Sequence, residues 1–142
     1  MRDNFWLASR LDRIWYAYFY DVERANNVFV RFKGRWKNKF GHISMKNDHS
    51  SEIVVNSLFR DERIPEGIID ATIAHEIIHY MHGFQSPHKR MYKHPHAGGI
   101  VTREMKRRGF AHIIYEEREF VQRHWLRLYN EITKKKPKSF FS

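Results

Sequence analysis

Cysteine is absent from the 142 residues of the chain, and long hydrophobic runs are absent as well. Without a thiol the chain cannot have a disulfide scaffold, a cysteine-ligated zinc ribbon, an iron–sulfur cluster or a cysteine nucleophile. No apolar stretch approaches the roughly 20 residues of a transmembrane helix. Charges interrupt the N-terminal segment MRDNFWLASRLDRIW, where a signal peptide would need a continuous apolar run. We therefore expect a cytoplasmic protein without a membrane partner.

Basic residues are plentiful: 26 Lys and Arg stand against 16 Asp and Glu, a net charge of +10. This excess favours an anionic partner, with nucleic acid as the first candidate, although an ordinary basic surface would have the same composition. Hydrophobic residues make up 42% of the chain and aromatic residues 15%. That is enough apolar surface for one sizeable core, which excludes a chain disordered throughout.

The hydrophobic periodicity predicts an α+β fold. We expect an N-terminal helix, then a small three-stranded sheet of antiparallel strands, then further helices. The expected helices span residues 4–20, 65–82, 97–108 and 111–133, and the expected strands span residues 28–32, 40–45 and 52–58. Gly83 and Gly109 are expected to end the second and third helices. We assign residues 1–133 to a single domain and residues 134–142 to a basic, frayed C-terminal tail.

One motif indicates chemistry. Residues 75–79 read His-Glu-Ile-Ile-His, in the middle of the helix expected over residues 65–82. His75 and His79 lie one turn apart on the same helix face, so both imidazoles can reach one metal ion. Glu76 is turned about 100° away, from where its carboxylate can reach a water on that metal. This HExxH pattern is typical of zinc peptidases. A His-rich polar helix face without metal is the alternative.

A catalytic zinc needs a third protein ligand and an open fourth position. The downstream candidates are His82, His88, His94, His96 and Glu104. His82 lies on the same straight helix, where three ligands converge poorly, and the position of a metzincin third ligand holds Gln85. A Glu104 ligand is disfavoured because Arg108 stands where a downstream acid is expected. The residues alone leave His88, His94 and His96 open.

The motif and its surroundings resemble the SprT-like domain, the zincin-type metallopeptidase domain of SprT and of the Spartan DNA–protein crosslink protease. The resemblance covers roughly residues 5–110, and its matching parts are VFVRF, Gly41 within KFGHISM, EIVVNSLF, ATIAHEIIHYMH and HAGGIVTREMKRRG. The chain differs in having Ala97 where the family has Gly after the ligand, and Ile100 where it has an aromatic residue. It also lacks the C-terminal zinc ribbon of many members.

The resemblance implies a zincin-like fold with an N-terminal helix, a small three-stranded sheet, an HExxH helix and two C-terminal helices. It implies that one catalytic Zn²⁺ is bound by His75, His79 and His96, with His94 as the runner-up third ligand, and that Glu76 is the general base. The implied activity is hydrolysis of peptide bonds by a metal-activated water. Tyr92, His88 or His94 could add an oxyanion donor.

The resemblance also implies a partner. The substrate would be a protein or peptide, including proteins associated with DNA, and the DNA would be single-stranded or crosslinked to protein. The protein would then lie at the nucleoid, or in the nucleus of a eukaryote. The strand over residues 52–58 could pair with an extended substrate, unless it is buried inside the sheet.

A basic segment over residues 31–40, RFKGRWKNKF, is the candidate nucleic-acid surface. Its Lys33, Arg35, Lys37 and Lys39 could hold phosphates while Trp36 stacks on exposed bases; the alternative is a set of solvated lysines that protects an edge strand. Three hypotheses follow: a zinc protease recruited to nucleic acid, a zinc-containing nucleic-acid-binding module without protease activity, and a zinc peptidase with no nucleic-acid role.

Overall fold

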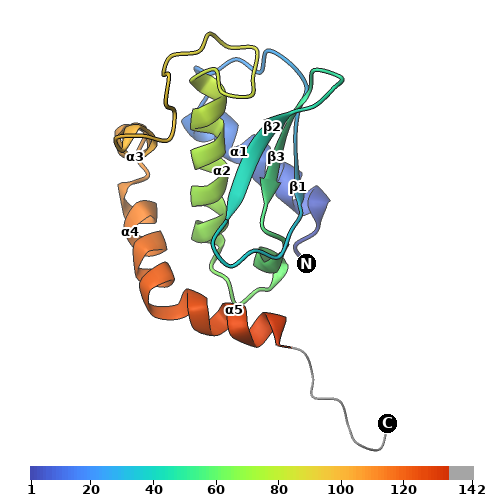
Figure 1. Cartoon of the computed structure of the whole chain (residues 1–142), viewed down its shortest axis with the longest axis vertical. Coiled ribbons are helices and arrows are strands. Elements are labelled where there is room, and N and C mark those ends of the chain that lie inside the picture. Colours follow the sequence, from blue (N-terminus) through green and yellow to red (C-terminus); the bar gives the residue numbers. More distant parts are fainter. Residues whose placement is uncertain (135–142) are drawn as a thin grey trace, which may run out of the picture.

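Helix α2, Glu66–Met81, is the central element of the computed structural model, which describes residues 1–134. It lies between the sheet on one side and the C-terminal helices on the other (Figure 1). Ile69, Ile73 and Ile77 of α2 are fully buried, as expected of apolar residues four apart on a helix that packs into the core. The HExxH motif occupies the C-terminal half of the same helix.

Helix α1, Asn4–Tyr18, packs against the sheet and against α2. The Asp3 carboxylate caps it by accepting the Trp6 N–H at 2.8 Å, because an N-cap side chain replaces a missing helical partner. Its buried residues recur every three or four positions and are Leu7, Leu11, Ile14 and Trp15. The predicted helix is thus confirmed, although it ends two residues before the expected end.

The sheet has three strands in the order β1-β3-β2, formed by β1 Val28–Phe32, β2 Gly41–Met45 and β3 Ser51–Val55. Strand β2 runs antiparallel to β3, but β1 runs parallel to it. The expectation of an antiparallel sheet is therefore wrong for one of the two pairs. All five residues of β3 are buried, and a strand covered on both faces takes the central place of a small sheet.

Strand β3 ends at Val55, before the expected end at residue 58, because Asn56 turns the chain. The buried Asn56 side chain accepts the Leu58 N–H at 3.0 Å and so caps a short 3₁₀ helix, η1, Ser57–Arg60. Its amide donates to the carbonyls of Trp36 and Lys39 at 2.7 and 2.8 Å. This polar side chain therefore ties the segment between β1 and β2 to the end of β3.

The described chain ends in a series of helical segments: α3 Ile100–Arg107, α4 Ala111–Phe120, a π-helical segment η2 Val121–Trp125, and α5 Leu126–Thr133. The single helix predicted over residues 111–133 is thus interrupted by a π segment, and its path bends around the bottom of α2 (Figure 1). Gly83 and Gly109 have φ of +80° and +97° and end α2 and α3 as predicted. The α3 helix starts three residues later than expected, after Gly98 and Gly99, which also have positive φ.

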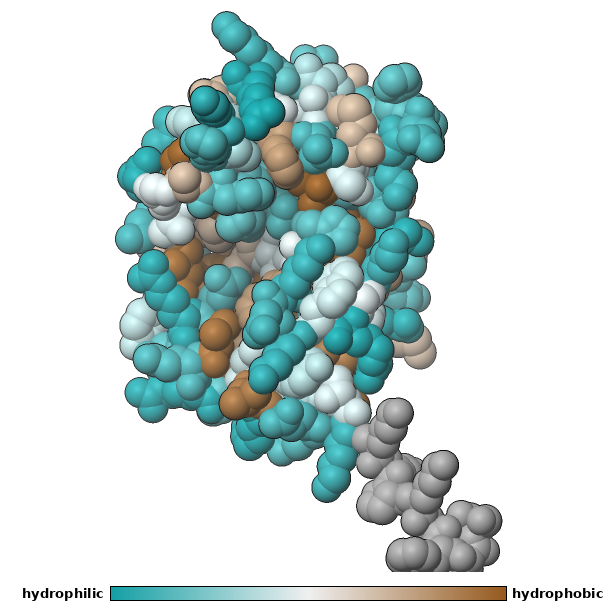
Figure 2. Space-filling model, in the orientation of Figure 1, coloured by the Kyte–Doolittle hydropathy of each residue, from teal (hydrophilic) through white to brown (hydrophobic). Residues whose placement is uncertain are grey.

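The predicted tail over residues 134–142 lies outside the described residues from residue 135 onward. Within residues 1–134, none of the helices combines the length and the apolar composition needed to cross a bilayer. Hydrophilic side chains dominate the face drawn in Figure 2, and hydrophobic ones show as separate patches among them. The zincin-like identity of the fold stays a prediction, while the α+β class with a small three-stranded sheet is confirmed.

Candidate metal and active site

The imidazoles of His75, His79 and His96 meet beside the C-terminal half of α2. His79 Nε2 lies 3.1 Å from His75 Nε2 and 3.1 Å from His96 Nδ1. Helix α2 supplies the first two rings, and the segment between α2 and α3 returns along the helix to bring in the third. The structure therefore brings together the three histidines that the resemblance implied as ligands.

The segment that carries His96 is anchored to the end of α2. Gly83 turns the chain with φ of +80°, and a Cβ there would collide with the backbone of Lys89. The Ser86 hydroxyl donates to the Tyr80 carbonyl at 2.6 Å. The Phe84 ring packs against the rings of both His79 and His96, with centroids 5.6 and 5.2 Å apart, so an apolar side chain supports the cluster from one side.

The cluster can be compared with the geometry of a zinc centre. Zinc binds imidazole nitrogen at roughly 2.0–2.1 Å, and tetrahedral ligands are then about 3.3 Å apart. The two nitrogen–nitrogen distances of 3.1 Å come close to this separation. As the side chains stand, no group of three or more His, Asp or Glu within residues 1–134 has the full arrangement needed to hold a metal ion. The rings would therefore have to rearrange to hold zinc, although a set of three imidazoles suits that metal.

Burial keeps the His75 and His79 imidazoles neutral. Desolvation, together with smaller effects of the neighbouring His75, His96 and His82 rings, lowers the pKa of His79 to about 3. His75 is exposed to solvent on one side, but protein atoms cover the rest of its ring. This desolvation lowers the pKa of His75 to about 4, and the His96 ring is the second cause. Neutral imidazole is the form that binds a metal. His79 Nδ1 is buried without a hydrogen-bond partner among the described residues.

Glu76 lies next to the cluster at the wall of a pocket of about 310 Å³. Only 5% of the residue is exposed, and burial raises its pKa to about 8, against the opposing charge of Lys39. The other residues that line the pocket are Asn38, Lys39, Phe40, Gly41, Ala71, Thr72, His75 and Glu117. A buried carboxylate beside imidazoles at an open pocket is the arrangement expected of a group that exchanges protons.

Sequence reasoning named Gly41 but missed its packing role at this pocket, and it missed Glu117 altogether. A Cβ on Gly41 would lie 2.6 Å from Thr72 Cγ2 and 2.6 Å from the Val54 carbonyl oxygen, so only glycine lets β2 approach α2 this closely. Glu117 reaches the pocket from α4, and burial raises its pKa, with Arg118 opposing. The Gly41 position belongs to the family pattern, whereas Glu117 had no signal because its place depends on how α4 packs across α2.

The other candidate ligands have different contacts. The buried His82 ring packs against Tyr92, with centroids 4.9 Å apart, and His88 Nε2 lies 2.6 Å from the Glu23 carbonyl oxygen. Glu104 is paired with Arg107 and Arg108 at 2.6 and 2.8 Å. His94, the runner-up third ligand, is exposed, and no ring contact with the cluster is found for it within the described residues.

The basic segment forms the connection between β1 and β2. Four of its five cations, Lys33, Arg35, Lys37 and Lys39, are exposed. The fifth, Arg31, lies in β1 and pairs with Glu52 at 2.9 Å. Trp36 is half-buried: its ring covers Gly34, and the Lys39 ammonium lies 4.7 Å from the ring centroid. The Trp125 indole donates to the Lys37 carbonyl at 2.8 Å. The four exposed cations therefore stand on an anchored loop, not on an edge strand, and one Trp36 face is already occupied.

The predicted substrate-pairing strand has to be corrected. Strand β3 lies between β1 and β2 and has no free edge, so it cannot accept an extended peptide. Strand β2 is an edge strand and runs beside α2. The carbonyl of Phe40 and the N–H of Lys46 bond toward the β3 side, whereas the Met45 N–H bonds to Gln85 on the other side at 2.8 Å. By the alternation of a strand, Gly41, Ile43 and Met45 direct their backbone groups away from β3.

Comparison of the chain with protein-family models, with curated proteins and with solved structures finds no match. The inference of function therefore rests on the residues and geometry of the site.

Proposed function

We propose that the chain is a zinc-dependent peptidase that hydrolyses peptide bonds, with His75, His79 and His96 as zinc ligands and Glu76 as general base. One observation carries the proposal: His79 Nε2 lies 3.1 Å from a ring nitrogen of both His75 and His96, beside the buried Glu76 in the wall of a pocket. A bound zinc ion would lower the pKa of its water to about 7 and polarise the scissile carbonyl.

The chain's own residues supply proton transfer and exclusion of bulk water. Glu76 takes the proton of the attacking water and delivers it to the leaving amine. Its burial among Ala71, Thr72 and Phe40 keeps bulk water from competing for this proton. A module that only bound a structural metal would have no use for a buried carboxyl group at this place, because desolvating its charged form costs free energy. Within residues 1–134 no ion pair of Glu76 is found.

The edge strand β2 offers a way to hold the substrate. Within residues 1–134 no outward hydrogen bond is found for the backbone groups of Gly41 and Ile43, which leaves them for an extended peptide. The outward Met45 N–H is already bonded to Gln85. Strand addition of this kind binds the peptide main chain irrespective of side chains. Because Gly41 also lines the Glu76 pocket, a peptide paired with β2 would pass the catalytic carboxylate.

A nucleic-acid partner is the second part of the proposal. Lys39 lines the Glu76 pocket and stands on the same loop as the exposed Lys33, Arg35 and Lys37. The cations and the pocket thus adjoin, which suits a substrate that is a DNA-associated protein. The same cations favour the second candidate function, a zinc-containing nucleic-acid-binding module without protease activity.

Replacing Glu76 by glutamine separates the two functions. We expect Glu76→Gln to retain one zinc ion per chain, measured by elemental analysis after dialysis, and to lose peptide cleavage by about 10²–10⁴-fold. The matched control is Glu62→Gln, at an exposed carboxylate, which should cleave as the wild type does. Single-stranded DNA should stimulate cleavage of a DNA-bound protein at low salt and lose this effect at higher salt. If the wild type, Glu76→Gln and Glu62→Gln all bind zinc and none of them cleaves peptide, the binding module is favoured.

A further inference from the structure

The connection between β1 and β2, residues 33–40, is called the basic loop. A second pocket, of about 380 Å³, lies beside Arg35 of this loop and has three arginines in its wall. The residues that line it are Met1, Arg2, Arg35, Ser57, Leu58, Arg60, Asp61 and Ile132. They come from the chain before α1, the basic loop, η1 with its following turn, and α5. Three cations from three separate segments are held at one hollow, although like charges repel.

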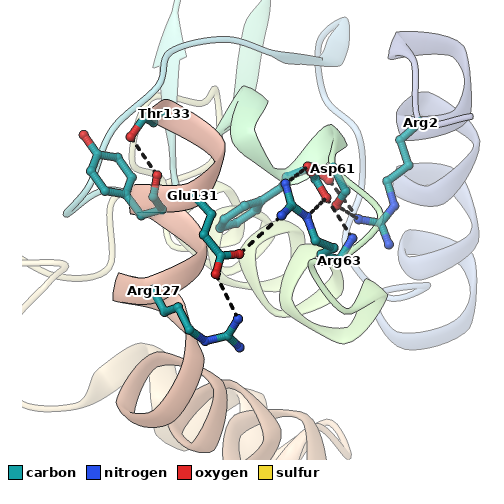
Figure 3. Close-up of polar contacts among 8 residues, drawn as sticks. Arg2, Asp61, Arg63, Arg127, Glu131 and Thr133 are labelled. Carbon is teal, nitrogen blue, oxygen red and sulfur yellow. Dashed lines mark hydrogen bonds and ion pairs between the residues drawn. The ribbon is translucent and has the colours of Figure 1, made fainter. Parts of the chain in front are cut away.

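Arg2 is a built-in part of this pocket, since only 7% of it is exposed. Its Nη1 donates to the carbonyls of Phe59 and Asp61 at 2.9 and 3.0 Å, contacts that fix the guanidinium group (Figure 3). No hydrogen bond from Arg2 Nε or Nη2 is found within the described residues. Burial lowers the pKa of Arg2, because desolvation disfavours the charged guanidinium group. A bound anion would offset this loss of solvation free energy.

The other two arginines are also placed by backbone contacts. Arg60 Nε donates to the Arg2 carbonyl at 3.1 Å, which leaves its two terminal nitrogens available. Arg35 follows Gly34, whose carbonyl accepts both the N–H and the hydroxyl of Ser57. The loop is therefore tied to η1 where Arg35 enters the pocket wall, and the side chains of Arg35 and Arg60 remain exposed.

The one carboxylate in the wall does not neutralise these cations. Asp61 binds Arg63 through both oxygens, at 2.9 and 2.8 Å, and these hydrogen bonds lower the pKa of Asp61. Arg63 in turn reaches Glu131 of α5 at 3.3 Å (Figure 3). Asp61 thus has its own partner. Glu66, Glu62 and Asp61 also raise the pKa of Arg2, but the effect of burial is larger. Within residues 1–134 no ion pair is found for Arg2, Arg35 or Arg60, so the lining keeps a net positive charge.

We propose that this pocket binds a phosphoryl group through Arg2, Arg35 and Arg60. A phosphoryl group has several anionic oxygens, which can accept hydrogen bonds from more than one guanidinium at once. Leu58 and Ile132 give the pocket an apolar wall, beside which a sugar or base could lie. The ligand is either a phosphodiester of nucleic acid or a free phosphate compound. The residues of this site are separate from those of the metal centre. Failure of the peptidase proposal would therefore leave this proposal intact, and the reverse also holds.

Calorimetric titration with inorganic phosphate and with a short single-stranded oligonucleotide tests the site, in low salt with a chelator present to remove any metal. We expect both Arg35→Gln and Arg60→Gln to weaken phosphate binding by about tenfold. The charge-matched control is Arg13→Gln, at an exposed position of α1 that does not line this pocket. It should bind as the wild type does.

The two ligands distinguish the sources. If the oligonucleotide shows the same pattern across the variants, the phosphoryl group belongs to nucleic acid; if only inorganic phosphate binds, it belongs to a small phosphorylated compound. Absence of phosphate binding by the wild type would overturn the proposal. An equal loss in Arg13→Gln would also overturn it, because general charge would then explain the binding. Thermal melting of each variant checks that the fold is retained.

Discussion

At the residue scale, the three clustered histidines are positioned by different kinds of structure. His75 and His79 meet because four residues make about one turn of α2, a relation that can be read from the sequence. His96 joins them across a segment of sixteen intervening residues, and only the folded chain shows that its Nδ1 comes within 3.1 Å of His79 Nε2. The first pair could therefore be predicted with its geometry, whereas the third member needed an alignment to a family pattern.

Replacing each candidate third ligand by alanine tests this assignment. We expect His96→Ala to lose bound zinc, because two imidazoles on one helix leave the metal with too few protein ligands. His94→Ala should retain one zinc ion per chain, because the exposed His94 ring does not contact the cluster. Elemental analysis of both variants after dialysis against excess zinc-free buffer decides the matter. A loss of zinc in His94→Ala with retention in His96→Ala would reverse the assignment.

At the element scale, the contact between β2 and α2 shapes the candidate active site. Gly41 begins β2 and lies against Thr72 of α2 and the Val54 carbonyl of β3. Any side chain at this position would push the edge strand away from the helix that holds Glu76. The pocket wall and the strand that we expect to hold the substrate therefore depend on one missing Cβ.

Gly41→Ala should lower the free energy of unfolding by about 1–3 kcal/mol, the usual cost of overpacking a close contact. It should also reduce peptide cleavage, because the displaced edge strand no longer passes Glu76. Combining it with Thr72→Ser removes the methyl group in contact, but the Val54 carbonyl still lies 2.6 Å from the new Cβ. The double variant should therefore recover part of the stability only, as measured by urea denaturation. Full stability in the single variant would contradict this account of the β2–α2 contact.

The elements themselves could largely be predicted, but their arrangement could not. The strand over residues 28–32 and the helix around HExxH have the predicted bounds within a residue, because local patterns of apolar residues determine them. The order β1-β3-β2 was missed, since it is decided by which strand can be buried on both faces. The π segment at Val121–Trp125 was missed as well; there the helical pattern continues in sequence while the packing of Trp125 against Phe40 and Phe59 redirects the chain.

At the scale of the whole molecule, one arginine joins the end of α1 to α3. Arg108, directly after α3, donates to the Tyr18 carbonyl at 2.8 Å and to both oxygens of Asp21 at 2.7 and 2.9 Å. It also donates to Glu104 at 2.8 Å. These contacts hold α3, and with it one end of the segment that carries His96, against the N-terminal part of the chain. The integrity of the histidine cluster is thereby linked to a charged network that does not belong to the site.

This network should make stability depend on acid pH. The hydrogen bond from Arg108 lowers the pKa of Asp21 below its ordinary 3.8; burial would raise the pKa of Glu104, but hydrogen bonds from Arg107 and Arg108 outweigh it and lower the pKa below 4.5. Since both values are lower in the folded chain than in the unfolded chain, their contribution is complete above about pH 4.5 and is lost as the pH falls through the folded values.

Arg108→Gln should therefore cost about 2 kcal/mol at neutral pH, most of it through the half-buried Glu104, because the exposed Asp21 is screened by solvent. The difference in unfolding free energy between this variant and the wild type should shrink steadily between about pH 4.5 and pH 3. Urea denaturation across this range measures it, with Arg13→Gln as the control for the loss of one positive charge. A difference that stayed constant down to pH 3 would mean that Arg108 stabilises the chain by packing against Phe19 and not through its two carboxylates.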